Sequence, residues 1–170
     1  MTIVTVTDLL RTIDATLAEK VAPSVGDVGG RSALATVRHL LNFVRVRVER
    51  EGQTLVDDIA ALQRLLIDLR GYLAGVGDSA MADGIADTLG MLPPPDSARY
   101  RALDELAADA AVLRETLHVA LAFLQRVRDT RRDDPAYRAA RAAIRAYTVR
   151  QIEQEGEIVA PAFFGRGPRR

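Results

Sequence analysis

The chain has 170 residues with 23 basic and 23 acidic side chains, so its formal net charge is zero, and it contains no cysteine or tryptophan. A chain of this length makes one domain with a sizeable core, while the lack of cysteine excludes disulfides, zinc–thiolate sites and thiol nucleophiles. The balanced charge argues against a dedicated nucleic-acid-binding domain.

Apolar residues recur at steps of three and four along most of the chain, which is typical of amphipathic helices. Thr5 and Asp8 have the spacing of a capping box and open the first predicted helix, which Pro23 stops.

Two further helices are predicted over 32–51 and 54–73, with Ser32 as the first N-cap. Gly52 suits a left-handed C-terminal cap between them, and Thr54 with Asp57 resembles a second capping box. We therefore expect these two helices to form an antiparallel hairpin.

The region 71–96 is a glycine- and proline-rich connection, in which 79–89 forms a short helix. The three prolines 93–95 favour extended backbone, because each ring fixes its own φ and disfavours helix in the residue before it.

A fourth helix is predicted over 97–129, which at 1.5 Å per residue spans about 50 Å, against about 30 Å for each hairpin helix. Asp134 followed by Pro135 signals the start of a fifth helix that runs to about Glu155. The sequence thus predicts an all-α, up-and-down bundle of four to five helices with a long fourth helix. It forms a single domain over 1–155 and carries a C-terminal tail over 156–170.

Glu115 and His118, three residues apart on the fourth helix, are the weak catalytic candidates. Di-iron bundles use such a pair twice, together with two more glutamates, and here no second Glu-x-x-His follows. The alternative is a Glu–His pair on the flank of the leucine ladder. We therefore predict no metal and no cofactor, and catalytic residues stay unassigned.

Two groups of side chains on the second and fifth helices are the predicted ligand-binding residues, because guanidinium forks suit carboxylate and phosphate groups. The alternative is that they pair with acidic residues across helix flanks. The groups are Arg38, Asn42 and Arg45, and Arg138, Arg141 and Arg145.

Phe163 and Phe164 supply half of the four phenylalanines and stand in the tail. Aromatic residues in a terminal segment anchor it either to the parent bundle or to a neighbour, so both are predicted partner-binding residues.

Three segments, Thr7–Leu17, Arg31–Ala35 and Ala60–Leu66, resemble an uncharacterised bacterial all-helical family. Its members are often encoded beside aminoglycoside-phosphotransferase-like kinases and acyl-CoA dehydrogenases. The resemblance implies a small cytoplasmic accessory protein that partners such an enzyme, and it implies no catalytic residue.

The first ten residues lack the basic start of a signal peptide, and no apolar run approaches 18 residues, so we expect a cytoplasmic protein without membrane association. Our leading hypothesis is a non-catalytic accessory or interaction subunit that associates with a protein partner or with itself, and not with nucleic acid. The alternative is an enzyme or binder that holds an anionic ligand between the second, fourth and fifth helices, less favourably a metal–carboxylate bundle.

Overall fold

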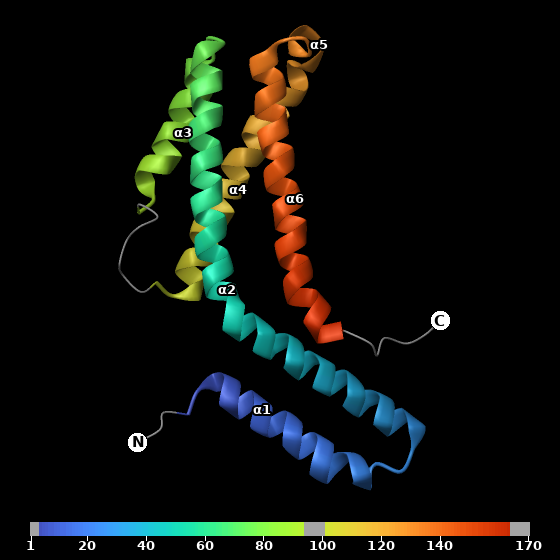
Figure 1. Cartoon of the computed structure of the whole chain (residues 1–170). Coiled ribbons are helices and arrows are strands. Elements are labelled where there is room, and N and C mark those ends of the chain that lie inside the picture. Colours follow the sequence, from blue (N-terminus) through green and yellow to red (C-terminus); the bar gives the residue numbers. More distant parts are fainter. Residues whose placement is uncertain (1–3, 94–100, 164–170) are drawn as a thin grey trace. The chain divides into compact units, whose positions relative to one another are not determined.

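The computed structural model describes residues 4–93 and 101–163, and every regular element in these ranges is helical, which confirms the all-α class. The elements in chain order are α1 (Val6–Thr16), a π-helical turn (Leu17–Val21), a 3₁₀ turn (Ala22–Ser24), α2 (Val28–Gly75), α3 (Ser79–Met91), α4 (Leu103–Arg126), α5 (Arg128–Arg131) and α6 (Pro135–Phe163) (Figure 1).

These helices form two compact units. Unit 1 comprises Met1–Glu51 and Glu153–Arg170, and unit 2 comprises Gly52–Ile152. Unit 1 therefore holds α1, the first part of α2 and the end of α6, whereas unit 2 holds the rest of α2 and α6 with α3, α4 and α5. The predicted single domain over 1–155 stays a prediction.

The predicted hairpin at Gly52 is wrong, because α2 is one helix of 48 residues that continues through this position. Gly52 does not adopt a left-handed conformation, which among the described glycines occurs at Gly77. The physical reason lies in the spacing of the apolar residues: Val48, Leu55 and Leu62 keep a constant step of seven across Gly52. Packing of this uninterrupted stripe outweighs the roughly 1 kcal/mol that a glycine costs within a helix.

The predicted capping box of α1 is confirmed. The Thr5 hydroxyl accepts from the Asp8 backbone N–H at 3.2 Å, and the Asp8 carboxylate accepts from the Thr5 backbone N–H at 3.2 Å. By contrast, α2 begins before the predicted Ser32. The Asp27 carboxylate accepts from the Gly30 N–H at 2.7 Å, and a Cβ on Gly30 would lie only 2.8 Å from the same carboxylate.

The turn between α2 and α3 ends α2 with a Schellman motif. The Asp78 N–H donates to the Leu73 carbonyl at 3.0 Å and the Gly77 N–H to the Ala74 carbonyl at 3.2 Å, with Gly77 at φ +85°. Asp78 also caps α3, so the short helix predicted over 79–89 is confirmed. The predicted connection 71–96 is largely helical up to Met91, and residues 94–95 of the triproline lie outside the described residues.

The fourth helix starts later than predicted. Helix α4 has 24 residues, half the length of α2, and residues 97–100 lie outside the described ranges. The predicted restart at Pro135 is confirmed, since the Asp134 carboxylate accepts from the Ala136 N–H at 2.8 Å. Helix α6 then continues past the predicted end at Glu155 as far as Phe163.

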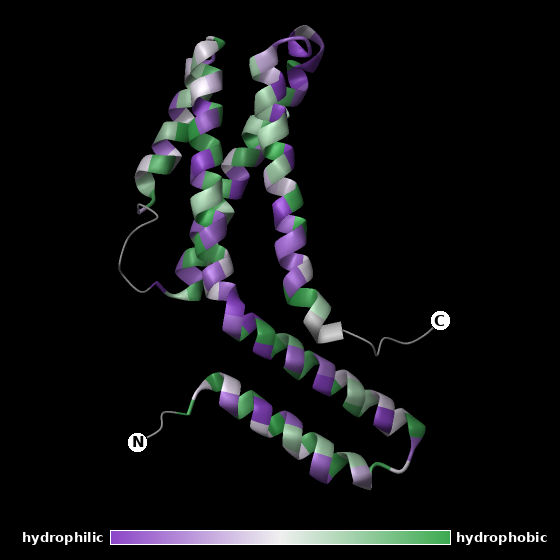
Figure 2. Ribbon diagram, viewed as in Figure 1, coloured by the Kyte–Doolittle hydropathy of each residue, from purple (hydrophilic) through white to green (hydrophobic). Residues whose placement is uncertain are grey.

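The hydrophobic core lies in unit 2. Figure 2 shows hydrophobic and hydrophilic residues alternating along each helix, the pattern of amphipathic helices. Side chains with almost no exposed surface come from three helices and each contribute about 2 kcal/mol by their burial. They are Leu62, Leu66, Leu69 and Leu73 of α2, Ile85 of α3, and Leu113 and Leu124 of α4.

Candidate functional site

A buried carboxylate joins three helices within unit 2. Asp58 of α2 is 1% exposed and accepts hydrogen bonds from the Arg114 guanidinium of α4 at 2.6 Å, the Tyr147 hydroxyl of α6 at 3.0 Å and the Gln151 amide of α6 at 2.5 Å. We call these four residues the Asp58 cluster. The two carboxylate oxygens accept three hydrogen bonds from within the chain, and a buried charge needs such partners.

The electrostatics of the Asp58 cluster follow from this burial. Desolvation and then the nearby Asp58 charge raise the pKa of Tyr147 to about 12. Burial opposes the charged form of Arg114, but the hydrogen bonds and charges of Tyr147 and Asp58 outweigh it, so the pKa of Arg114 is raised. A phenol and a guanidinium held in these protonation states are hydrogen-bond donors at neutral pH. The cluster therefore links α2, α4 and α6 through one buried acceptor, and a link of this kind favours a single register of the three helices.

The sequence carried a signal for this cluster that periodicity reasoning missed. Asp58 stands three residues after Leu55 and four before Leu62, which places an acid within an apolar ladder. Tyr147 and Gln151 share the inner face of α6 with Ile144. A charged side chain on a core stripe needs buried partners, and the polar residues on the facing stripes are the natural ones.

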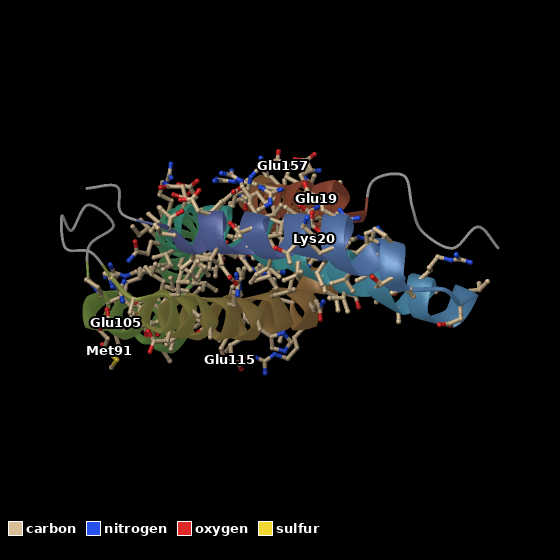
Figure 3. All side chains as sticks on the ribbon, turned by 90° about the horizontal axis from the view of Figure 1, so that it is seen from below. Glu19, Lys20, Met91, Glu105, Glu115 and Glu157 are labelled. Atoms are coloured by element: carbon tan, nitrogen blue, oxygen red, sulfur yellow. The ribbon has the colours of Figure 1, made fainter. Side chains whose placement is uncertain are left out.

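Glu115 and His118, the predicted catalytic pair, are both exposed on α4. Glu115 points outward in Figure 3 and lines a 500 Å³ hollow between α3 and α4, while His118 lines an adjoining hollow that shares Met81, Val119 and Arg126 with the first. Within residues 4–93 and 101–163, no group of three or more His, Asp or Glu side chains is arranged to hold a metal ion.

The predicted ligand-binding residues of the second helix are bound to neighbours in unit 1. Arg38 donates to both Asp14 oxygens, at 2.7 and 3.2 Å, and this hydrogen bonding lowers the pKa of Asp14. Arg45 donates to Glu49 at 3.0 Å and to Asn42 at 2.7 Å. This is the flank pairing that the sequence left open as the alternative.

The second predicted group lies in unit 2, on α6. Arg138 and Arg145 are exposed and Arg141 is half-buried. The Nη1 atom of Arg141 has no hydrogen-bond partner in the described part of the chain. An anionic pocket shared by the two arginine groups stays a prediction.

The predicted partner-binding residues stand at the end of the described chain. Phe163 is the last residue of α6, and Phe164 lies outside the described residues. Just before them, Ile158 is 2% exposed, and the Glu155 carboxylate accepts from Arg47 at 2.6 Å, so this part of the tail packs within unit 1.

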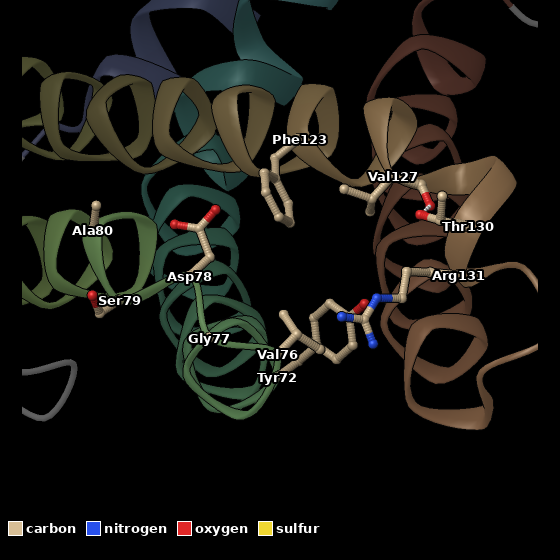
Figure 4. A pocket seen from close by; sticks show the side chains of 10 residues that line it. All are labelled: Tyr72, Val76, Gly77, Asp78, Ser79, Ala80, Phe123, Val127, Thr130 and Arg131. Atoms are coloured by element: carbon tan, nitrogen blue, oxygen red, sulfur yellow. Dashed lines mark hydrogen bonds between the residues drawn. The ribbon is translucent and has the colours of Figure 1, made fainter.

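A cleft of about 420 Å³ opens in unit 2 where α2 ends and α3 begins. Figure 4 shows the Tyr72 ring beside the Arg131 guanidinium, with Asp78 and Phe123 nearer α3 and α4. Burial, followed by the charge of Asp134, raises the pKa of Tyr72, and its hydroxyl has no hydrogen-bond partner among the described residues. The cleft combines one acid, one base and two aromatic rings, which selects no single class of ligand.

Unit 1 carries an exposed apolar surface on two of its helices. Seven aliphatic side chains of α1 and α2 each leave between 45% and 56% of their surface exposed. We call this surface the apolar face. It consists of Val6, Leu9 and Ile13 of α1 and Val37, Leu40, Val44 and Val48 of α2.

Ion pairs close one edge of the contact between α1 and α2. Arg38 pairs with Asp14 at 2.7 Å, and Arg11 pairs with Glu49 at 3.5 Å. These pairs fix which edges of the two helices meet, and they tie α1 to α2 along that edge.

Successive residues of a helix are rotated by about 100° around its axis. This rotation places partly buried leucines between the ion pairs and the apolar face on each helix. They are Leu10 of α1, Leu17 at the start of the π-helical turn, and Leu34 and Leu41 of α2. The ion pairs join α1 and α2 on one side of these leucines. The exposed residues of both helices therefore lie on the other side of the leucines. The apolar face is therefore one continuous surface contributed by two helices.

Comparison with protein-family models, curated proteins and solved structures gave no match. In the part of the chain that the structure describes, no helix combines the length and apolar character needed to cross a membrane.

Proposed function

We propose that the protein is a non-catalytic interaction subunit, in which unit 2 is the folded body and the apolar face of unit 1 contacts another protein surface. The observation that carries this proposal is the half-exposure of all seven side chains of the apolar face. A contiguous apolar surface of this kind is typical of protein–protein contact sites.

The energetics favour a covered face. Burying the exposed half of an aliphatic side chain contributes about 1 kcal/mol, so seven of them contribute roughly 7 kcal/mol. This gain lies within the range of about 4–15 kcal/mol that association costs in lost freedom of motion. The seven side chains therefore only offset this cost, and net association needs the neighbouring backbone and side-chain area of the face as well.

The chemistry of the polar groups supports a non-catalytic role. Asp58 accepts hydrogen bonds from three donors of its own chain, and Arg38 and Arg45 are held in pairs within unit 1. Glu115 and His118 are both exposed on the surface of α4. The resemblance noted in the sequence adds a candidate class of partner, a kinase-like or acyl-CoA-metabolising enzyme.

Site-specific photo-crosslinking in cells tests this proposal. A photoactivatable amino acid is placed at Val44, in the apolar face, or at Ala35, which is exposed nine residues earlier and so lies on the opposite side of α2. We expect a covalent adduct to another polypeptide from position 44 and none from position 35.

This test requires only that position 44 is crosslinked to another polypeptide, whichever protein that is. Absence of an intermolecular adduct at position 44, or equal labelling at both positions, would show that the apolar face meets no protein. Either result would overturn the proposed function.

A further inference from the structure

We infer that the occupant of the apolar face is a second copy of this chain. The apolar faces of the two copies then pack against each other as two layers, each made of α1 and the first part of α2. This inference rests on the proposed function and specifies its partner. Each copy contributes α1 and the first part of α2.

Unit 1 presents one layer of what can become a two-layer helical arrangement. Two of its three helical segments, α1 and the first part of α2, carry the apolar face, and this apolar side needs a second layer to cover it. Rotation of a second copy by 180° about an axis within the interface supplies an identical layer, and the result is a four-helix arrangement. In such an isologous contact, each residue of the face meets a residue of the same face.

The spacing of the apolar residues agrees with this arrangement. Five residues on the first part of α2 follow a strict alternation of three and four, the spacing of a coiled-coil seam. They are Leu34, Val37, Leu41, Val44 and Val48. The leucines of this set are partly buried, whereas the valines are exposed, so unit 1 covers only one side of the seam.

The area of the apolar face suits a dimer. Residues 6–21 span about 24 Å, and two adjacent helices are about 20 Å wide, so the footprint is roughly 500 Å² on each copy. Two copies then bury roughly 1,000 Å², the lower bound for a specific interface. We therefore expect a reversible dimer whose population depends on protein concentration.

The charges around the apolar face favour an uncharged partner surface. The seven residues of the face carry no charge, and Arg47 at its border is already paired with Glu51 at 3.2 Å and Glu155 at 2.6 Å. On α1, the Thr12 and Thr16 hydroxyls donate to carbonyls of their own helix at 2.9 and 2.8 Å. The exposed Lys20 at the end of the footprint is the one charge within residues 6–21 on this side of the helix, so a charged partner finds little counter-charge, whereas a second copy presents a matching and mostly uncharged surface.

Analytical ultracentrifugation of the full chain over a range of concentrations tests this inference. We expect the wild-type protein to reach twice the chain mass of 18.5 kDa. Val44→Glu and Ile13→Glu each place an unpaired carboxylate in the interface and should weaken dimerisation at least tenfold. The matched control Ala35→Glu adds the same charge on the opposite side of α2 and should dimerise like the wild type. Circular dichroism checks that all variants stay helical.

A wild-type chain that remains monomeric at every concentration would overturn the inference, as would a dimer unaffected by both face variants. The crosslinking experiment separates this failure from failure of the proposed function. If position 44 gives an adduct that does not have twice the chain mass, the interaction role stands and a different protein is the partner. If position 44 gives no intermolecular adduct, both proposals fail.

Discussion

Unit 2 and unit 1 are built from similar leucine and valine ladders, yet only unit 2 covers its own. The central core cluster has 17 buried residues, and all of them lie between Ile59 and Ile144. Among the described residues of unit 1, the buried hydrophobic ones are Val46 and Ile158. The difference follows from how the helices are arranged: those of unit 2 enclose a core, whereas α1, the first part of α2 and the end of α6 in unit 1 leave the apolar face uncovered.

The polar groups show the same contrast. Unit 2 buries Asp58 and surrounds it with three donors, whereas the ion pairs of unit 1 remain partly exposed. Buried polar networks fix helix register at high cost if broken, while exposed ion pairs contribute little. The two units should therefore respond very differently to equivalent substitutions.

The largest expected effect compares two leucines of α2. Leu66 is fully buried in unit 2, so Leu66→Ala should lower the free energy of unfolding by about 3–4 kcal/mol through lost burial and a residual cavity. Leu40 is 53% exposed in unit 1, so in dilute protein Leu40→Ala should cost less than about 0.5 kcal/mol. Urea unfolding measures both variants, and equal losses would erase the contrast between the units.

Asp58→Ala should lower the free energy of unfolding by about 3 kcal/mol, because it leaves the guanidinium, phenol and amide donors without their acceptor. All four tyrosines lie between residues 52 and 152, so tyrosine fluorescence during urea unfolding reports on unit 2. The control is Asp57→Ala, whose carboxylate accepts an exposed hydrogen bond from Gln53 at 3.0 Å. A loss no greater than that of the control would show that the Asp58 cluster does not hold the helices together.

The cluster also predicts a pH dependence at the alkaline end. Because the pKa of Tyr147 is about 12 in the folded state, above the ordinary value of about 10, the unfolded chain loses this proton first. The contribution of Tyr147 to stability is therefore complete below about pH 10 and is lost as the pH rises toward about 12. Tyr147→Phe should remove this component. The difference between wild type and variant should shrink by about 2 kcal/mol over that interval, and a constant difference would contradict the assignment.

The smallest effect concerns unit 1. Arg38→Ala removes a partly exposed pair and should cost less than about 1 kcal/mol. The lowered pKa of Asp14 stabilises the fold above the ordinary carboxylate range, and this contribution is lost as the pH falls. Hydrogen exchange of α1 near neutral pH and in acid measures the effect. A loss as large as that of Asp58→Ala would mean that unit 1 has a core-like polar cluster of its own.

Sequence periodicity was sufficient for the helical class, for the capping box at Thr5 and for the restart at Pro135, because each depends on neighbours a few residues away. It failed at Gly52, where local turn signals competed with an unbroken stripe from Val48 to Leu55. Turn chemistry favoured a break, and packing over many residues favoured continuation. Only the constant step of seven across the glycine pointed to the single helix.

The functional features were harder to predict for a related reason. The pairings of Arg38 and Arg45 were open alternatives, since flank charges of either sign are common on helices. The Asp58 cluster joins residues up to 93 positions apart, so its members come together only through tertiary packing. The apolar face was hidden in the same ladders that signal a core, because spacing shows that residues share a face and does not show whether anything covers it.

Hydrogen exchange across a dilution series tests whether unit 2 completes its own core while unit 1 is completed by a second copy. We expect amide protection in α1 and residues 37–48 to rise with protein concentration, while protection in residues 59–73 stays constant. Protection of α1 that is already as high as that of residues 59–73 at the greatest dilution, and independent of concentration, would contradict this expectation.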